Sequence, residues 1–125
     1  MGRNILVVDD SPTLRNSLSF CLENASYNII QSENGQEGLD MLSRFMEDGR
    51  SVSLIITDIN MPVMDGIRFI REVKATSFRY VPILVLSTET EREQKDKAKE
   101  AGAAGWLNKP FRTEQLLWVV KKFIR

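Results

Sequence analysis

Three aspartates, a serine and a lysine stand where apolar segments of this sequence end. Asp9 and Asp10 follow the first apolar segment, and Asp58 follows the third. Ser87 follows the fourth segment, and Lys109 comes shortly after the fifth. Two carboxylates about 4 Å apart repel by roughly 1 to 4 kcal/mol at effective dielectric constants of 80 to 20, so three in one cleft need a cation. Hard carboxylate oxygens with room for water suit Mg²⁺.

With a metal and a lysine in place, one carboxylate can act as a nucleophile toward phosphorus. Aspartyl phosphates are an established class of covalent intermediate. Phosphoryl transfer depends on positioning and on neutralising oxygen charge more than on a proton shuttle, which suits a chain without histidine. The alternative is a structural role, in which Asp9 and Asp10 cap a helix, Asp58 belongs to a turn and Lys109 pairs with them.

Composition excludes several other chemistries. The chain has 125 residues with 17 basic and 17 acidic side chains, which argues against the basic surface that nucleic acid or lipid headgroups require. Without histidine there can be no Ser-His or Cys-His catalysis, no His-ligated zinc and no phosphohistidine on this chain. A single cysteine, Cys21, rules out an internal disulfide and a thiolate metal cluster.

Length and hydropathy indicate one domain over residues 1–125. No apolar run approaches the ~20 residues of a membrane span. The N-terminus lacks the apolar core of a signal peptide, because Asp9 and Asp10 interrupt its apolar run. We therefore expect a soluble cytoplasmic protein that contacts neither nucleic acid nor membrane.

Five short apolar segments alternate with amphipathic stretches along the chain. Solid apolar blocks such as Ile5–Val8 and Ile83–Leu86 are typical of strands covered on both faces, as in a parallel sheet. The alternation predicts right-handed crossovers and a doubly wound α/β sheet, which we take in the strand order 2-1-3-4-5. The predicted strands are Ile5–Val8, Asn28–Ile30, Leu54–Thr57, Ile83–Leu86 and Ala104–Leu107.

The stretches between these strands have helical spacing. Ser11 and Pro12 mark a helix start, and Gly102 a helix end. The fourth helix, from about Glu91, is polar. The residues expected on the apolar sides of the five helices are, in order, Leu14, Leu18, Cys21, Leu22 and Ala25; Leu39, Leu42 and Met46; Ile67, Ile70 and Val73; Ala98 and Ala101; and Leu116, Leu117, Val120, Phe123 and Ile124.

In doubly wound sheets, ligands bind in the crevice beyond the carboxyl ends of the strands. The three aspartates, Ser87 and Lys109 would meet there. The loop Met61–Gly66 after Asp58 shapes the same crevice. In this loop Pro62 fixes φ and Gly66 permits unusual backbone angles.

Four segments carry a resemblance to a known family: Val8–Ser11, Thr57–Gly66, Leu86–Thr88 and Gly105–Phe111. Together they resemble the receiver domain of two-component response regulators, and within it the single-domain chemotaxis regulators of the CheY type. The resemblance covers the whole chain. It implies a flavodoxin-like, doubly wound sheet of five parallel strands in the order 2-1-3-4-5, with five helices.

The resemblance implies a role for each residue of the cleft. Asp58 would accept a phosphoryl group from a histidine kinase. Asp10 and Asp58 would bind Mg²⁺ through their carboxylates and Asn60 through its main-chain carbonyl, while Asp9 would hold the waters of the metal. Lys109 would contact the phosphoryl group. The domain would assist its own phosphorylation and dephosphorylation without being a turnover enzyme.

The resemblance also implies a switch. Ser87 would move to a phosphoryl oxygen, and Trp106 would swing into the space that Ser87 vacates. Asn60 and Glu89 occupy positions that tune self-hydrolysis, and both are polar enough to hold an attacking water. We therefore expect the phosphoryl group to last seconds to minutes. The peptide bond between Lys109 and Pro110 is expected to be cis.

Output would pass through the face of the fourth helix, fifth strand and fifth helix. Trp118 falls opposite the apolar side of the fifth helix, as either a solitary exposed residue or part of a docking surface. The resemblance suggests a CheA-type kinase, a flagellar motor switch protein and a phosphatase as partners. The alternatives are a receiver excised from a longer regulator with an output domain, a haloacid-dehalogenase-like phosphatase, which needs an Asp-x-Asp nucleophile after the first strand, and a phosphorylation-independent binding module.

Overall fold

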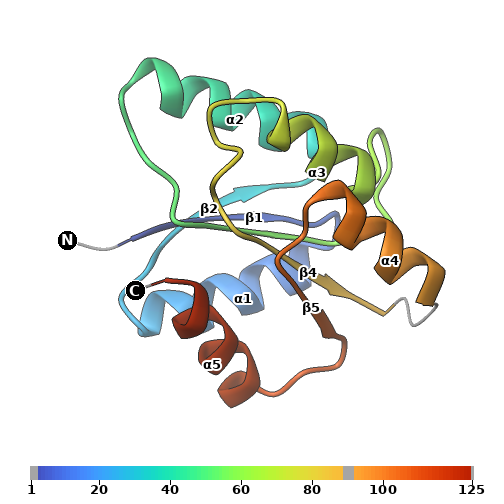
Figure 1. Cartoon of the computed structure of the whole chain (residues 1–125). Helices are drawn as coiled ribbons and strands as arrows, with labels where there is room; N and C mark the ends of the chain where they lie inside the picture. Colours follow the sequence, from blue (N-terminus) through green and yellow to red (C-terminus); the bar gives the residue numbers. More distant parts are fainter. Residues whose placement is uncertain (1–2, 89–91, 125) are drawn as a thin grey trace.

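The computed structural model describes residues 3–88 and 92–124, and over these ranges strands and helices alternate (Figure 1). The strands lie within two residues of the predicted segments, which confirms the α/β expectation. The strands are β1 (Asn4–Val8), β2 (Asn28–Ser32), β3 (Leu54–Thr57), β4 (Ile83–Ser87) and β5 (Gly105–Asn108). The helices are α1 (Pro12–Asn24), α2 (Gly35–Glu47), α3 (Gly66–Lys74), α4 (Arg92–Ala101) and α5 (Thr113–Phe123).

The five strands form one parallel sheet in the order β2-β1-β3-β4-β5, as predicted. The register aligns Val8 of β1 with Thr57 of β3, and Ser87 of β4 with Asn108 of β5. Strands β1, β3 and β4 lie inside the sheet and are buried almost throughout, which is why their sequences are continuous apolar runs. The carboxyl ends of these strands therefore meet at one edge of the sheet.

Helices cover both faces of the sheet, with α2, α3 and α4 on one side and α1 and α5 on the other (Figure 1). On the first side, Phe45 and Phe69 pack against the β1 and β3 side chains that point toward α2 and α3. On the second side, Leu22 and Leu116 pack against those that point toward α1 and α5. Within residues 3–88 and 92–124, no helix combines the length and the apolar character needed to cross a membrane.

Side-chain caps fix where the helices begin. Ser11 accepts a hydrogen bond of 3.2 Å from the N–H of Leu14, with Pro12 in the first turn of α1, as the sequence indicated. Asp65 caps α3 in the same way, through a bond of 2.9 Å from the N–H of Arg68. These caps fix the first turn of α1 close to the end of β1, and the first turn of α3 at the end of the loop that follows Asp58.

The predicted inner side of α2 was wrong at one position. Met46 was expected to pack with Leu42, but it is 62% exposed, whereas Phe45 is only 3% exposed. The inner stripe runs through Gly38, Leu42 and Phe45, spacings of four and then three residues that keep to one side of the helix.

By contrast, Gly102 ends α4 with φ 121°, the positive value that favours glycine, as predicted.

Candidate functional site

Asp9, Asp10 and Asp58 come together at the carboxyl edge of the sheet, where the sequence predicted an acidic cluster. Each offers a carboxylate oxygen, and these three oxygens lie within 4.8 Å of one another. The pairing of β1 with β3 brings them together, because it ends with Val8 beside Thr57. Asp9 is 3% exposed, whereas Asp10 is open to solvent. A small cation arriving from solution would meet Asp10 first.

Lys109 reaches this cluster from the loop after β5. Its Nζ donates to Oδ2 of Asp9 at 3.1 Å and to Oδ2 of Asp58 at 3.0 Å. Its backbone N–H donates to the carbonyl oxygen of Ser87 at 2.9 Å, and the following peptide bond, to Pro110, is cis as expected. The lysine side chain is 17% exposed, so both ion pairs are shielded from bulk water.

Burial and pairing act in opposite directions on these groups. Burial raises the pKa of Asp9 above its usual range, although the N–H of Ser11 and the ammonium of Lys109 act to lower it. Burial acts to lower the pKa of Lys109, but the hydrogen bonds and charges of Asp58 and Asp9 outweigh it, and the pKa is raised. Three carboxylates facing one ammonium leave two negative charges unbalanced when all are ionised.

The backbone around Asp58 fixes the direction of its carboxylate. Oδ1 accepts a hydrogen bond of 2.6 Å from the N–H of Ile59, while Oδ2 faces Lys109. The main chain is held on both sides, because the N–H of Asp58 donates to the carbonyl of Val8 and the hydroxyl of Thr57 donates to the carbonyl of Asp58. Asp58 thus presents a carboxylate with a fixed orientation at the rim of the sheet.

The loop after Asp58 depends on a glycine for a different reason from the one expected. Gly66 does not adopt a positive φ; the positive value in this loop, 71°, belongs to Val63. Instead, the N–H of Gly66 bonds the carbonyl of Ile59 at 2.7 Å, and a Cβ at Gly66 would lie 2.0 Å from the carbonyl oxygen of Asp58. Glycine is needed there because the helix start approaches the Asp58 backbone so closely.

The remaining predicted residues lie around the cluster. Ser87 is fully buried at the end of β4. Trp106 of β5 is half-buried, and its indole N–H donates to Oδ1 of Asn108. Asn60 is exposed and lines a groove of about 350 Å³ between α3 and α4. Glu89 lies outside the described residues.

Sequence reasoning missed Arg15, which holds the turn between β1 and α1. Its Nη1 donates to the carbonyl oxygen of Asp9 at 2.6 Å, and its Nε donates to Oε1 of Gln31 at 3.2 Å. The available signal was spacing. Arg15 comes four residues, about one helical turn, after the cap Ser11, so its side chain can reach back to the turn that contains Asp9 and Asp10. Nothing in the sequence alone pairs Arg15 of α1 with Gln31 of β2.

The donor set of the cluster suits a hard divalent cation. All three groups offer carboxylate oxygens, the ligands that Mg²⁺ takes, and Asp10 leaves the cluster open to water. The unbalanced negative charge of the cluster is of the sign and size that one such ion neutralises. The residues present therefore fit a magnesium ion.

Comparison with known proteins gives one consistent result. The model of the "Response regulator receiver domain" family matches residues 5–121. The sensor histidine kinase CheAY of Helicobacter pylori is 32% identical over 97% of this chain, which spans 15% of that protein. The chain covers between 15% and 57% of the length of several curated relatives, so it corresponds to one part of them.

Solved structures agree with the sequence matches. The chemotaxis response regulator CheY4 of Vibrio cholerae has a TM-score of 0.89 and 37% identity, over 99% of this chain and 100% of that chain. The receiver domain of the sensor histidine kinase PA1611 from Pseudomonas aeruginosa PAO1, with a magnesium ion coordinated in its active site cleft, has a TM-score of 0.81 and 25% identity, over 98% of both chains. Because the family model runs from β1 into α5 and these relatives agree with it in sequence and in fold, the chain belongs to the response regulator receiver domain family.

Proposed function

We propose that this domain accepts a phosphoryl group on Asp58 from the phosphohistidine of a histidine kinase. The P–N bond of the donor breaks as a P–O bond forms to a carboxylate oxygen of Asp58, and the electron pair of the broken bond stays on the histidine nitrogen. The observation that carries the proposal is the position of Lys109, which bonds Asp58 and Asp9 at once. A cation in that position can also contact a phosphoryl oxygen.

The acidic cluster is also the proposed Mg²⁺ site. Asp10 and Asp58 hold Mg²⁺ through their carboxylates and Asn60 through its main-chain carbonyl, and Asp9 holds the waters of the metal. When bound, the ion neutralises charge on the transferring phosphoryl oxygens. The likeness to the PA1611 receiver, whose cleft coordinates magnesium, supports this assignment, as does the fit of the acidic cluster. The domain assists its own phosphorylation and dephosphorylation and does not turn over an external substrate.

We also propose a switch that involves Ser87 and Trp106. In the proposal, the Ser87 hydroxyl moves to a phosphoryl oxygen, and Trp106 moves inward to fill the space left. Both residues lie on paired strands that end beside Lys109, which supports a direct link between the site and the indole. Asn60 and Glu89 tune hydrolysis by holding water, so the phosphoryl group lasts seconds to minutes in Mg²⁺. A phosphorylated form that persisted for many hours would contradict this part.

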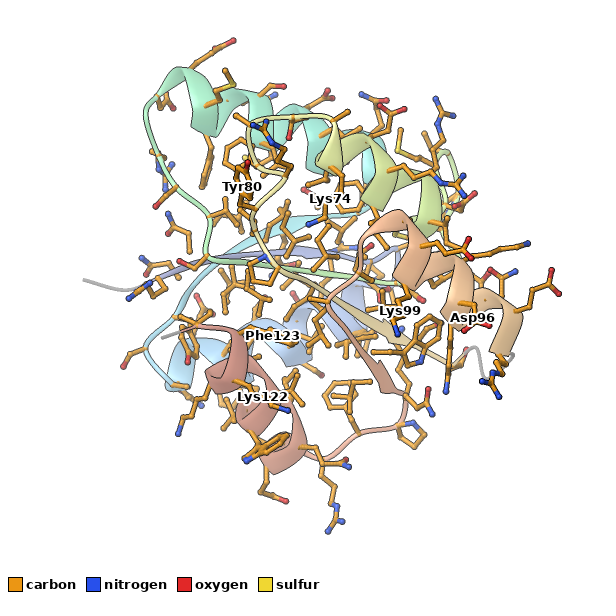
Figure 2. All side chains as sticks on the ribbon, viewed as in Figure 1. Lys74, Tyr80, Asp96, Lys99, Lys122 and Phe123 are labelled. Carbon is orange, nitrogen blue, oxygen red and sulfur yellow. The ribbon has the colours of Figure 1, made fainter. Side chains whose placement is uncertain are left out.

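The α4–β5–α5 face is the proposed output surface. Figure 2 labels Asp96 and Lys99 on α4 and Lys122 on α5, on the two sides of β5. On α5, Trp118 is 64% exposed, with Nζ of Lys122 4.8 Å from the centre of its ring. Trp118 also lines a hollow of about 490 Å³. Exposed tryptophan beside a hollow is typical of a binding hot spot.

The proposed partners are a CheA-type kinase, a phosphatase and a flagellar motor switch protein, and the proposed setting is chemotaxis in the cytoplasm. The likeness to CheAY and to CheY4 supports this setting. Trp118→Ala should weaken the output partner's binding more than tenfold and leave phosphorylation unchanged. If every partner's affinity stayed within twofold, the output surface would lie elsewhere. The alternative is a receiver excised from a longer regulator with a separate output domain, which is supported by the likeness to the transcriptional regulatory protein FixJ, of which this chain covers 57%.

One titration tests the acceptor, the metal and the switch together. Beryllofluoride, which mimics a phosphoryl group, is added with and without Mg²⁺ while Trp106 fluorescence is followed in a Trp118→Phe background. A saturable, Mg²⁺-dependent change that disappears in Asp58→Asn is the expected result. Binding seen by calorimetry without a fluorescence change would contradict the switch alone. No binding at all would contradict the phosphoacceptor function.

A further inference from the structure

A chain of side-chain hydrogen bonds lies behind the acidic cluster and has no part in the proposed chemistry. Arg15 of α1 donates through Nε to Oε1 of Gln31 on the edge strand β2, at 3.2 Å. Gln31 in turn donates through Nε2 to Oγ of Ser19 on α1, at 2.8 Å. Ser19 is only 5% exposed. These hydrogen bonds therefore connect the solvent-facing amide of Gln31 to the buried hydroxyl of Ser19, and Arg15 is the last residue of the series.

At the arginine end, this series of hydrogen bonds is attached to the turn that carries Asp9 and Asp10. Nη1 of Arg15 donates to the carbonyl oxygen of Asp9 at 2.6 Å. A peptide group is planar, so holding this carbonyl also fixes the direction in which the chain leaves for Asp10. With the residues of the described ranges, the Asp10 carboxylate makes no hydrogen bond or ion pair that would orient it independently. Its position therefore depends on the backbone of the turn.

The arrangement needs an arginine and a correctly turned amide. A guanidinium offers donors in a rigid fork, so Nε and Nη1 can serve two acceptors at once, which a lysine ammonium on a flexible stem does not reproduce. The amide of Gln31 has one accepting and one donating end. Because its NH₂ bonds Ser19, its oxygen is the end that faces Arg15.

We infer that Arg15, held by Gln31, is a positioning residue of the cation site that presents Asp10 to the metal. This inference rests on the proposed function, because it concerns the same magnesium ion. The arginine charge by itself works against a cation in the cluster, since like charges repel. Removing Arg15 should therefore weaken Mg²⁺ binding if the residue acts by positioning Asp10, and strengthen it if the residue acts through its charge. Outer partners of metal ligands contribute about 10- to 100-fold to metal affinity when they orient the ligands.

The test uses substitutions that separate the two effects. Arg15→Lys keeps the charge and loses the fork, Gln31→Met is neutral and removes the partner that orients Arg15, and Arg15→Met removes both charge and fork. Arg44→Lys and Gln36→Met, on the exposed side of α2, are the matched controls. The dissociation constant for Mg²⁺ is measured by calorimetry on each full chain at 0.1 M and 1 M KCl. Melting without metal checks that each variant is folded.

Arg15→Lys and Gln31→Met should each weaken Mg²⁺ binding on the order of tenfold, the low end of the range for such partners. The controls should bind as the unsubstituted chain does. The loss should persist at 1 M KCl, because salt screens charge but not geometry. If Arg15→Met bound Mg²⁺ more tightly at low salt only, and Gln31→Met bound it unchanged, Arg15 would act through its charge and the inference would be wrong. If the unsubstituted chain bound no Mg²⁺, the proposed function itself would fail. Gln31→Met keeps the test decisive should the Arg15 variants unfold.

Discussion

The indole N–H of Trp106 donates a hydrogen bond of 2.6 Å to Oδ1 of Asn108. The two residues are two apart on β5, so their side chains lie on the same side of the sheet. Lys95 of α4 lies with Nζ 5.6 Å from the centre of the indole ring. Asn108 directly precedes Lys109, which bonds Asp58. This hydrogen bond therefore holds the Trp106 ring against the end of β5, directly before Lys109, whose side chain reaches the acidic cluster.

Asn108→Ala should ease the proposed inward movement of Trp106. A hydrogen bond contributes about 0.5 to 1.5 kcal/mol net, so its loss should shift the outward-to-inward equilibrium by roughly fivefold. Beryllofluoride with Mg²⁺ should then complete the fluorescence change at lower concentration, in the Trp118→Phe background. Asn24→Ala, on the exposed end of α1, is the control. Superimposable titrations for Asn108→Ala and the control would mean that the bond does not restrain the ring.

The alternation of strands and helices and the acidic cluster could be predicted from the residues, and the strand order from the family resemblance, whereas the Trp106–Asn108 bond could not. Strands buried on both faces appear as apolar blocks, and residues that follow such blocks collect at one edge of the sheet. A hydrogen bond between two side chains depends on rotamers that packing selects. The same limit explains the error in α2, where Phe45 rather than Met46 packs inward, because one residue of helix rotation separates the two.

Asp10→Asn should stabilise the metal-free domain. Lys109 pairs with Asp9 and Asp58, so Asp10 is the carboxylate of the cluster without that pairing. Removing its charge relieves repulsion on the order of 1 kcal/mol, near the lower limit for a solvent-exposed group. Unfolding by urea in the presence of a chelator measures this gain. Added Mg²⁺ should stabilise the unsubstituted domain and leave the variant unchanged, because a ligand stabilises only the state that binds it.

The control for Asp10→Asn is Asp40→Asn, an exposed aspartate on α2 outside the cluster. It removes one negative charge from the molecule without touching the site. Asp40→Asn should leave both the metal-free stability and the response to Mg²⁺ as they are. Equal metal-free stability of Asp10→Asn and the unsubstituted domain would refute repulsion within the cluster.

The contribution of Lys109 to stability should disappear in alkali. Its pKa in the folded state is raised, so the folded protein holds the lysine proton more tightly than the unfolded chain, whose lysines titrate near 10.4. The stabilisation is therefore complete below the unfolded pKa and is lost as the pH rises through the folded pKa. The difference in free energy of unfolding between the unsubstituted domain and Lys109→Met should narrow above about pH 10.4.

Urea unfolding at a series of pH values from 8 to about 12, without divalent ions, measures this difference. Lys121→Met, on the exposed side of α5, controls for the general effect of losing a lysine. Its difference from the unsubstituted domain should stay small throughout. A gap for Lys109→Met that kept its size across the alkaline range would show that the ammonium does not stabilise the folded state through its two carboxylates.

How the site is supported was less predictable than which residues form it. Asp9, Asp10, Asp58 and Lys109 follow strand ends, so their meeting point depends only on topology. The close approach at Gly66 comes from three-dimensional packing, where the start of α3 lies against the backbone of Asp58. Sequence identified this glycine but not its reason, because a missing Cβ permits both unusual φ values and close contacts.

Val63 lies in the loop Met61–Gly66 after Asp58, and its replacement should raise the free energy of unfolding. It is β-branched and 74% exposed, yet it has φ 71°, in the region where L-residues lose roughly 1 to 2 kcal/mol. Here the order of glycine and alanine should reverse from the usual one. Val63→Gly should be more stable than Val63→Ala by about 1 kcal/mol, since glycine adopts positive φ freely and alanine does not. At Ser43, exposed within α2, the glycine variant should instead be less stable than the alanine variant by a similar amount. Thermal melting of the four variants compares the two sites, at about 4 °C per kcal/mol for a domain of this size. The same order at both positions would mean that Val63 sits in its turn without strain.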